Sequence, residues 1–292
     1  MKTPNYIFEK KSNTSFRLTL PKWSKQNKLK LLLLSDIHLD NKHCNQSLLK
    51  RHLQEAKSEN ALIICNGDTF CAMEGKWDKR RDQDALREEL RGNNYLDKLV
   101  EYHANFWEPY ADNLLYFGHG NHETSIEAHH QTNLIDRLVE RLKLKNKNVQ
   151  SAGYWSWLQI KLISCQTSIN VTNLFAHHGC GGGAPVTKGL IDIARMQVFL
   201  PDADIIWIGH KHNEFEVTEA RSRLSRAGVQ YKDEQISFMT PGYKDEIDEN
   251  TGRGWAQERF HPRPKPQGGR WLEFNYDRMT NGRVNVQSYF AK

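Results

Sequence analysis

The sequence contains no long apolar run and no segment that resembles a secretory signal. No purely aliphatic run is longer than four residues, as in the leucines at 31–34, whereas a membrane-spanning helix needs roughly 20 apolar residues. The first twelve residues are polar and charged and lack the apolar stretch of a signal peptide. We therefore expect a soluble cytoplasmic protein with no membrane partner.

Cysteine is scarce, and no low-complexity segment is present. The five cysteines are an odd number, lie far apart and form no Cys-x-x-Cys pair, so they suit reduced thiols better than a disulfide framework. The charged fraction of 26% and the aromatic fraction of 10% are those of a globular protein. A chain of 292 residues can form one large α/β domain or two smaller ones.

Basic residues outnumber acidic ones, and the formal net charge of +6 permits an anionic partner without identifying one. From residue 251 onward, eight Lys and Arg residues stand against three acids. The arm between Trp255 and Lys265 mixes basic and aromatic side chains, which can follow a nucleic-acid backbone while the rings stack on bases. The alternative is a proline-stiffened arm that covers a sheet edge or a neighbouring subunit.

Short apolar runs alternate with segments of helical spacing along most of the chain, which predicts an α/β fold. Alternating or continuous apolar patterns predict strands at 15–20, 31–35, 61–65, 113–117, 154–164, 169–176, 204–208, 214–219, 228–239, 271–275 and 283–290. Apolar stripes or a charged helical composition predict helices at 45–58, 82–91, 95–107, 132–144 and 187–200.

Five of these predicted strands end in side chains that can bind metals. Loops at the carboxyl ends of strands meet at one edge of an open α/β sheet, so residues far apart in sequence can form one site there. The side chains are Asp36 and His38, Asp68, Asn121 and His122, His177 and His178, and His210 and His212.

Carboxylates, imidazoles and an amide oxygen, without a thiolate, suit Mn, Fe or Zn better than a structural zinc cage. A carboxylate can bridge two cations through its two oxygens. Two cations about 3.5–4 Å apart clamp a phosphate and acidify a bound water, which supplies hydroxide as the nucleophile. The pattern therefore predicts hydrolysis of a phosphate ester.

In order and spacing, these motifs resemble the five signature blocks of the calcineurin-like metallophosphoesterases, over roughly residues 31–212. The resemblance implies a four-layer α-β-β-α sandwich of two mixed sheets flanked by helices, here with a C-terminal β-rich extension. We expect an N-terminal strand and a basic segment at 1–30, a catalytic domain at 31–245, and a basic and aromatic, Pro- and Gly-rich arm at 246–292 whose C-terminal strands pack on the same domain. The blocks are Asp36-x-His38, Gly67-Asp68, Gly120-Asn121-His122-Glu123, His177-His178-Gly179 and Gly209-His210-x-His212.

The resemblance also implies a role for each residue. His122 matches the catalytic histidine, which stabilises the transition state or protonates the leaving group. Neighbouring strand residues point to opposite faces, so either His177 or His178 is the fourth-block ligand, and matching members of the family favour His178. The implied ligands are Asp36, His38 and His212 for one metal, Asn121, His210 and His178 for the other, and Asp68 as the bridge.

The glycine-rich loop at 179–183 has two interpretations: backbone N–H groups that cradle a phosphate, or a surface loop without a ligand. For the whole chain we expect a phosphodiesterase that acts on nucleic acid, DNA or RNA, or on nucleotides, with two divalent metals among which Mn is favoured. The alternatives are a phosphomonoesterase, including a protein phosphatase, and a non-catalytic scaffold.

Overall fold

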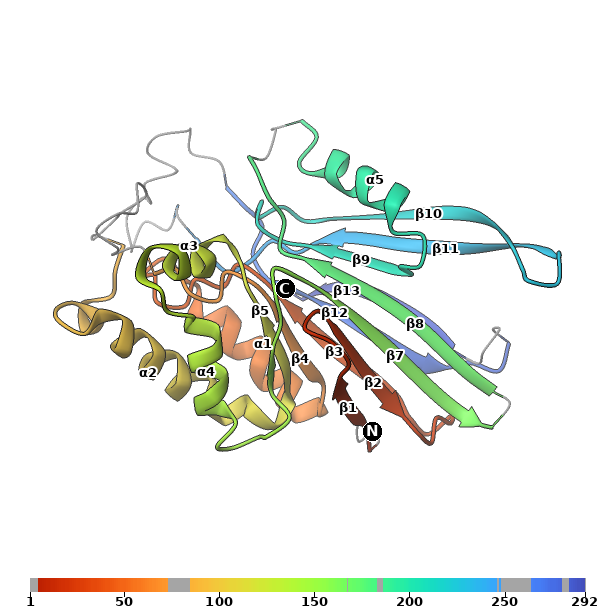
Figure 1. Cartoon of the computed structure of the whole chain (residues 1–292), viewed down its shortest axis with the longest axis horizontal. Coiled ribbons are helices and arrows are strands. Elements are labelled where there is room, and N and C mark those ends of the chain that lie inside the picture. Colours follow the sequence, from red (N-terminus) through yellow and green to blue (C-terminus); the bar gives the residue numbers. More distant parts are fainter. Residues whose placement is uncertain are drawn as a thin grey trace.

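The computed structural model describes residues 5–72, 85–166, 168–182, 186–245, 247, 264–279 and 284–291. Within them, two sheets pack face to face (Figure 1). The first has seven strands in the order β1 (Ile7–Lys10), β2 (Ser15–Leu20), β7 (Trp155–Cys165), β8 (Ser168–His177), β9 (Ile205–Ile208), β11 (Gln230–Met239) and β10 (Phe215–Leu224). The second has six, in the order β13 (Val284–Ala291), β12 (Gly269–Tyr276), β3 (Lys28–Leu34), β4 (Leu62–Asn66), β5 (Leu114–Gly118) and β6 (Gln150–Ser151).

Both sheets are mixed, because each contains parallel and antiparallel strand pairs: β8 and β9 are parallel but β7 and β8 antiparallel, while β3 and β4 are parallel but β3 and β12 antiparallel. In β3, Leu31 and Leu33 belong to the core between the sheets, whereas Leu32 and Leu34 belong to the core beneath the helices. A strand whose two faces are both buried is apolar at every position. This explains the uninterrupted leucine run.

Helices pack on the outer face of each sheet, and on the seven-stranded sheet helix α5 (Leu190–Phe199) covers the region of β8 and β9 rather than the whole face. Leu49, Leu99 and Leu138, from three different helices, pack in one core with the β3 and β4 side chains. On the seven-stranded sheet, Ile193 packs on Phe175 and Ile206. The described helices are α1 (Gln46–Glu59), α2 (Tyr95–Trp107), α3 (Asn121–His130), α4 (Leu134–Leu142) and α5 (Leu190–Phe199), with 3-10 turns at Glu88–Leu90 and Glu108–Asn113.

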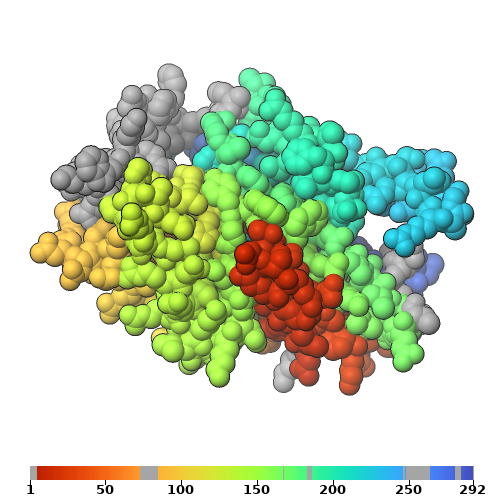
Figure 2. All heavy atoms as spheres, in the orientation of Figure 1, coloured from red at the N-terminus to blue at the C-terminus, as the bar shows by residue number. Residues whose placement is uncertain are grey.

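The observed layers run helix, sheet, sheet, helix, which confirms the predicted four-layer sandwich of two mixed sheets. The C-terminal strands belong to it, because β12 pairs antiparallel with β3, with Arg270 opposite Leu33. Figure 2 shows the N-terminal strands against the β7 and β8 region on one face of the molecule. In the described part of the chain, no helix is long and apolar enough to cross a membrane.

The predicted helix at 82–91 is wrong over its described part. Residues 85–91 form an extended segment with a single 3-10 turn. Leu86 bridges to Asn41, and the Arg87 guanidinium donates to the carbonyls of Leu39 and Asn41. The segment therefore uses its polar groups to pair with the loop after β3.

Helix α3, in contrast, was not predicted. Ile126 is its only buried apolar side chain, so the sequence lacks the apolar stripe by which a helix is recognised. Most of the arm between Trp255 and Lys265 lies outside the described residues. At its described end, the Lys265 ammonium donates to the Lys211 carbonyl at 3.1 Å and to Asn213 Oδ1 at 3.2 Å.

Candidate metal centre

The predicted side chains meet at the carboxyl ends of strands from both sheets. Asp36 and His38 follow β3, Asp68 follows β4, and Asn121 and His122 begin α3 just after β5. From the other sheet, His178 follows β8, while His210 and His212 follow β9. The two sheets thus contribute opposite walls of one cluster.

Among the described residues, two groups of three predicted ligands each have potential ligand atoms within 4.8 Å of one another. In the first group, His212 Nε2 lies 3.3 Å from Asp36 Oδ1. In the second, His178 Nε2 lies 3.2 Å from Asp68 Oδ2. The first group is Asp36, His38 and His212, and the second is Asp68, His178 and His210.

Asp68, a member of the second group, also faces the first. Its Oδ2 atom is 4.0 Å from His38 Nε2 in the first group and 3.2 Å from His178 in the second. The Asn121 amide oxygen joins the second group, at 3.3 Å from His178 Nε2. These nitrogen and oxygen donors, with a carboxylate that faces both groups, fit a pair of divalent cations.

The structure places His178, rather than His177, in the cluster. The His178 ring is fully buried, and its Nδ1–H donates to the Asn66 carbonyl at 2.9 Å, which leaves Nε2 directed at Asp68. The His177 ring lies on the other face, where its Nδ1 accepts from the Gly179 amide. The bond from His178 Nδ1 to a backbone carbonyl is typical of a histidine whose other ring nitrogen binds a metal.

His122 faces the same carboxylate from α3. Its Nδ1–H donates to the Cys71 carbonyl at 2.5 Å, and its Nε2 lies 3.9 Å from Asp68 Oδ2. The His38 ring contacts it edge-on, with 4.7 Å between centroids. His122 is therefore held with one nitrogen toward the cluster.

Cys71 also has its sulfur near His38 and His122. Burial raises the pKa of this thiol to about 12, so it stays protonated at neutral pH. The Asn41 amide donates to the sulfur at 3.2 Å. Cys71 thus accepts the His122 hydrogen bond at its backbone carbonyl, and its thiol lies beside the same ring.

Many site residues have a left-handed backbone. Ten non-glycine residues in the described part have positive φ, a conformation that costs of order 1–3 kcal/mol per residue and concentrates at functional sites. Five of the ten are in the cluster: Asp36 (51°), His38 (48°), Asp68 (49°), His210 (71°) and His212 (49°).

Two glycines lie so close to the carboxylates of Asp68 and Asp36 that a side chain on either glycine would clash with them. A Cβ on Gly120 would lie 2.1 Å from Asp68 Oδ1, and one on Gly209 would lie 2.7 Å from Asp36 Oδ2. In the glycine-rich loop, by contrast, a Cβ on Gly181 or Gly182 would meet nothing within 4 Å. The glycines beside the carboxylates are therefore required by packing, and those two loop glycines are not.

The carboxylates create a negative potential that suits cations. Burial opposes ionisation of Asp68, but the surrounding His178 and His122 hold its pKa well below the usual range. Burial also opposes the cationic form of His178, yet Asp68 and Asp36 raise its pKa to about 10. Without a metal, a proton on His178 thus neutralises the charge that a divalent cation would meet.

A second set of buried groups, which no sequence block predicts as ligands, supports the candidate ligands. Glu123 accepts hydrogen bonds from the amides of Asp68, Phe70 and Gly120 at 2.8–3.1 Å. Burial, and then Asp68, raise its pKa to about 7. Glu123 therefore ties the loop after β4 to the start of α3.

Asp40 supports the turn that holds His122. Its carboxylate accepts from the amides of Cys71 at 2.6 Å and Ala72 at 2.8 Å, and it lies 3.3 Å from His103 Nε2. The one sequence signal for Asp40 is that it continues the every-second-residue pattern of Asp36 and His38. The His103 ring is buried and stacks on Phe70 with 3.7 Å between centroids.

The sequence and the fold were compared with those of known proteins. No curated protein matches the sequence. Similar solved structures include a predicted phosphoesterase from Streptococcus pneumoniae TIGR4 (11% identity, 90% of both chains covered, TM-score 0.34). A second is GAP50, the anchor in the inner membrane complex of Plasmodium (13% identity, 91% of this chain and 85% of that chain covered, TM-score 0.43). A third is Vps29 of Chaetomium thermophilum (9% identity, 90% of this chain and 95% of that chain covered, TM-score 0.32).

The calcineurin-like phosphoesterase family matches residues 29–214, well over half of the chain. This span contains all five sequence blocks and both groups of candidate ligands. The chain therefore belongs to the calcineurin-like phosphoesterase family, which supports metal-dependent hydrolysis of phosphate esters at a dinuclear centre.

Proposed function

We propose that the protein is a phosphodiesterase that hydrolyses nucleic acid or nucleotides. The observation that carries this proposal is the position of Asp68, whose carboxylate faces both groups of donors and also His122. One carboxylate shared by two cations, with a histidine beside it, is the arrangement that a two-metal phosphoesterase needs.

The donor sets assign the ligands. Asp36, His38 and His212 would hold one metal, His178, His210 and Asn121 would hold the other, and Asp68 would be shared between them. When bound, the two cations polarise the phosphoryl oxygens and lower the pKa of a coordinated water. We favour Mn, with Fe and Zn as alternatives, because the set contains imidazoles and oxygens without a thiolate.

His122 is the catalytic residue in this proposal. The Cys71 carbonyl accepts the Nδ1 proton, so the tautomer is fixed and Nε2 is the nitrogen available to the phosphate. When protonated, Nε2 donates to a non-bridging oxygen or to the leaving oxygen. A positioned acid of this kind contributes roughly 10²–10⁴-fold to the rate.

The preference for a diester of nucleic acid rests on charge. The chain is basic overall, and Lys244 is close enough to His38 to help lower its pKa, after burial and His122. Lys265, on the basic arm, reaches the backbone of the loop between His210 and His212. Cations beside the centre suit a polyanionic substrate.

The test compares a diester with a monoester on the purified protein. We expect hydrolysis of bis-para-nitrophenyl phosphate and of labelled DNA or RNA with Mn, and a loss of at least about 100-fold in Asp68→Asn. Asp97→Asn is the matched control, because Asp97 is an exposed carboxylate that pairs with Arg137. Turnover of para-nitrophenyl phosphate alone would indicate a phosphomonoesterase. No turnover with Mn, Fe or Zn would indicate a scaffold.

A further inference from the structure

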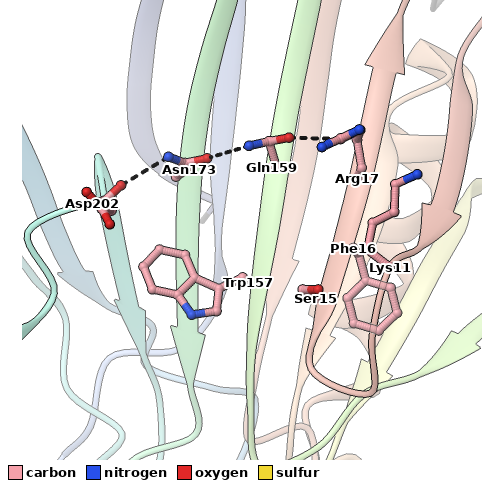
Figure 3. Close-up of a pocket in the computed structure, with 8 residues that line it drawn as sticks. All are labelled: Lys11, Ser15, Phe16, Arg17, Trp157, Gln159, Asn173 and Asp202. Carbon is pink, nitrogen blue, oxygen red and sulfur yellow. Dashed lines mark hydrogen bonds between the residues drawn. The ribbon is translucent and has the colours of Figure 1, made fainter.

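The outer face of the seven-stranded sheet has an open hollow that the metal centre does not use. Its volume is about 310 Å³, and β2, β7 and β8 form its floor (Figure 3). Helix α5 packs on this sheet over Phe175 and Ile206, toward β9. The strands beyond it, toward the N-terminus, therefore present polar and aromatic side chains to the solvent.

The polar side chains of the hollow form one hydrogen-bonded row. Arg17 Nε donates to Gln159 Oε1 at 2.8 Å, and the Gln159 amide donates to Asn173 Oδ1 at 3.3 Å. The Asn173 amide donates in turn to the Asp202 carbonyl at 3.1 Å. Figure 3 shows the row across three strands, with Arg17 and Asp202 at opposite ends and the Trp157 indole beside it. The row fixes the orientation of each side chain before any ligand arrives.

A continuous series of rings connects the hollow to the metal centre. Trp157 contacts Phe175 at 5.0 Å between centroids, and Phe175 contacts Trp155 at 6.0 Å and His177 at 6.4 Å. Tyr154 then contacts His177 at 5.5 Å and His178, in the centre, at 5.4 Å. Trp155 is 41% exposed, so its ring can be reached from the solvent.

We propose that this face binds single-stranded nucleic acid and guides it to the metal centre. One base stacks on Trp157, Arg17 and Lys11 bind its phosphates, and the strand continues over Trp155. Interleaved cations and rings are what single strands require, since every base has a stacking face and every linkage a charge. The amides of Gln159 and Asn173 offer polar groups to the edge of the base.

This inference rests on the proposed function, because the bound strand would be the substrate of the same centre. It narrows the substrate to a chain long enough to span both sites. Along a strand, residues advance by about 3.3 Å, and Trp157 pairs with Phe175, three residues before His178. Trp157, at the near end of the hollow, is therefore about 10 Å along the strand direction from the fourth-block ligand, and Asn173, five residues before His178, is about 17 Å from it; both are within reach of a short oligonucleotide.

The experiment measures the affinity of a fluorescent twelve-residue oligothymidine by anisotropy, with EDTA present so that the strand is not cleaved. Removing the ring in Trp157→Ala is expected to weaken binding roughly 5- to 150-fold. Arg17→Gln is expected to reduce the slope of log affinity against log salt by about 0.7. The matched control is Tyr231→Ala, which removes an exposed ring on β11 and should bind like the wild type.

Thermal unfolding of each variant separates loss of binding from loss of fold, and Trp157→Phe, which keeps a ring, should recover part of the affinity. Equal affinity in the wild type, Trp157→Ala and Arg17→Gln would overturn the inference, even if the wild type hydrolysed bis-para-nitrophenyl phosphate. Trp157-dependent binding of maltohexaose in place of the oligonucleotide would overturn it as well. Trp157-dependent binding of the strand without hydrolysis of any diester would refute only the proposed function.

Discussion

Replacing Gly120 by alanine tests whether the position of the Asp68 carboxylate controls the centre. Gly120 precedes α3 with φ −116° and ψ −171°, a conformation open to any residue, so alanine causes no backbone strain there. The added Cβ would lie 2.1 Å from Asp68 Oδ1 and 2.5 Å from the Asp68 amide nitrogen. The effect of the substitution is therefore steric and aimed at one residue.

The size of the effect follows from these distances. Ordinary contacts of a Cβ begin at 3.4 Å, so the carboxylate must move by more than about 1 Å, a misplacement that can lower the rate about 10²-fold. The backbone cannot absorb the shift easily, because Glu123 accepts from the amides of both Gly120 and Asp68. Overpacking of this kind also destabilises a fold by about 1–3 kcal/mol.

The assay measures kcat on bis-para-nitrophenyl phosphate at saturating Mn, bound metal per chain, and the free energy of unfolding. Gly153→Ala is the matched control, because its Cβ would meet the Trp155 carbonyl at 3.6 Å and Thr14 Cγ2 at 4.0 Å, both ordinary contacts. We expect Gly153→Ala to resemble the wild type. Full activity and a full metal complement in Gly120→Ala would refute the reasoning.

Three further substitutions probe the ligands and their support. Asp36→Asn keeps a side chain that tolerates the left-handed backbone but removes the charge, so we expect loss of bound metal and activity; unchanged metal content would contradict the ligand role. His178→Ala should lose metal while His177→Ala keeps it, and the reverse result would show that the wrong histidine was chosen. Asp40→Asn should lower stability by roughly 1–3 kcal/mol at pH 7. Burial raises the pKa of Asp40, but the hydrogen bond and charge of His103 lower it, and the net result is a pKa below the ordinary value. The stabilisation by the Asp40 carboxylate is therefore present above about pH 4 and is lost as pH falls through the pKa of the folded protein. A stability difference between wild type and Asp40→Asn that does not shrink in acid would contradict this.

Much of the centre could be predicted because each sequence block is an apolar strand followed within a few residues by its candidate ligands. The run at 31–34 is apolar since both faces of β3 are buried, and it ends where Asp36 and His38 reach the sheet edge. The same holds for Asp68 after β4. An apolar strand and the polar residues after it are consecutive in the chain, so a single sequence is enough to identify them.

The rest depends on contacts that leave no local pattern. Asp40 and Glu123 bind backbone amides, and every residue has such an amide, so no sequence signal identifies the partner. Strand alternation predicts that His177 and His178 point to opposite faces. Which of them meets Asp68 is decided by how the two sheets pack, and that is a property of the whole fold.

The left-handed backbone of the candidate ligands is held by hydrogen bonds from neighbouring loops. A residue with positive φ persists only where its neighbours determine its conformation. Here the Asp36 amide donates to the Gly67 carbonyl at 3.1 Å, the His38 amide donates to the Asp68 carbonyl at 3.0 Å, and the Asp36 carbonyl accepts from the Tyr243 amide at 3.0 Å. These bonds join the loops after β3 and β4 to each other and to the segment after β11. The donors are consequently held in place before a cation binds, and binding does not have to order the loops.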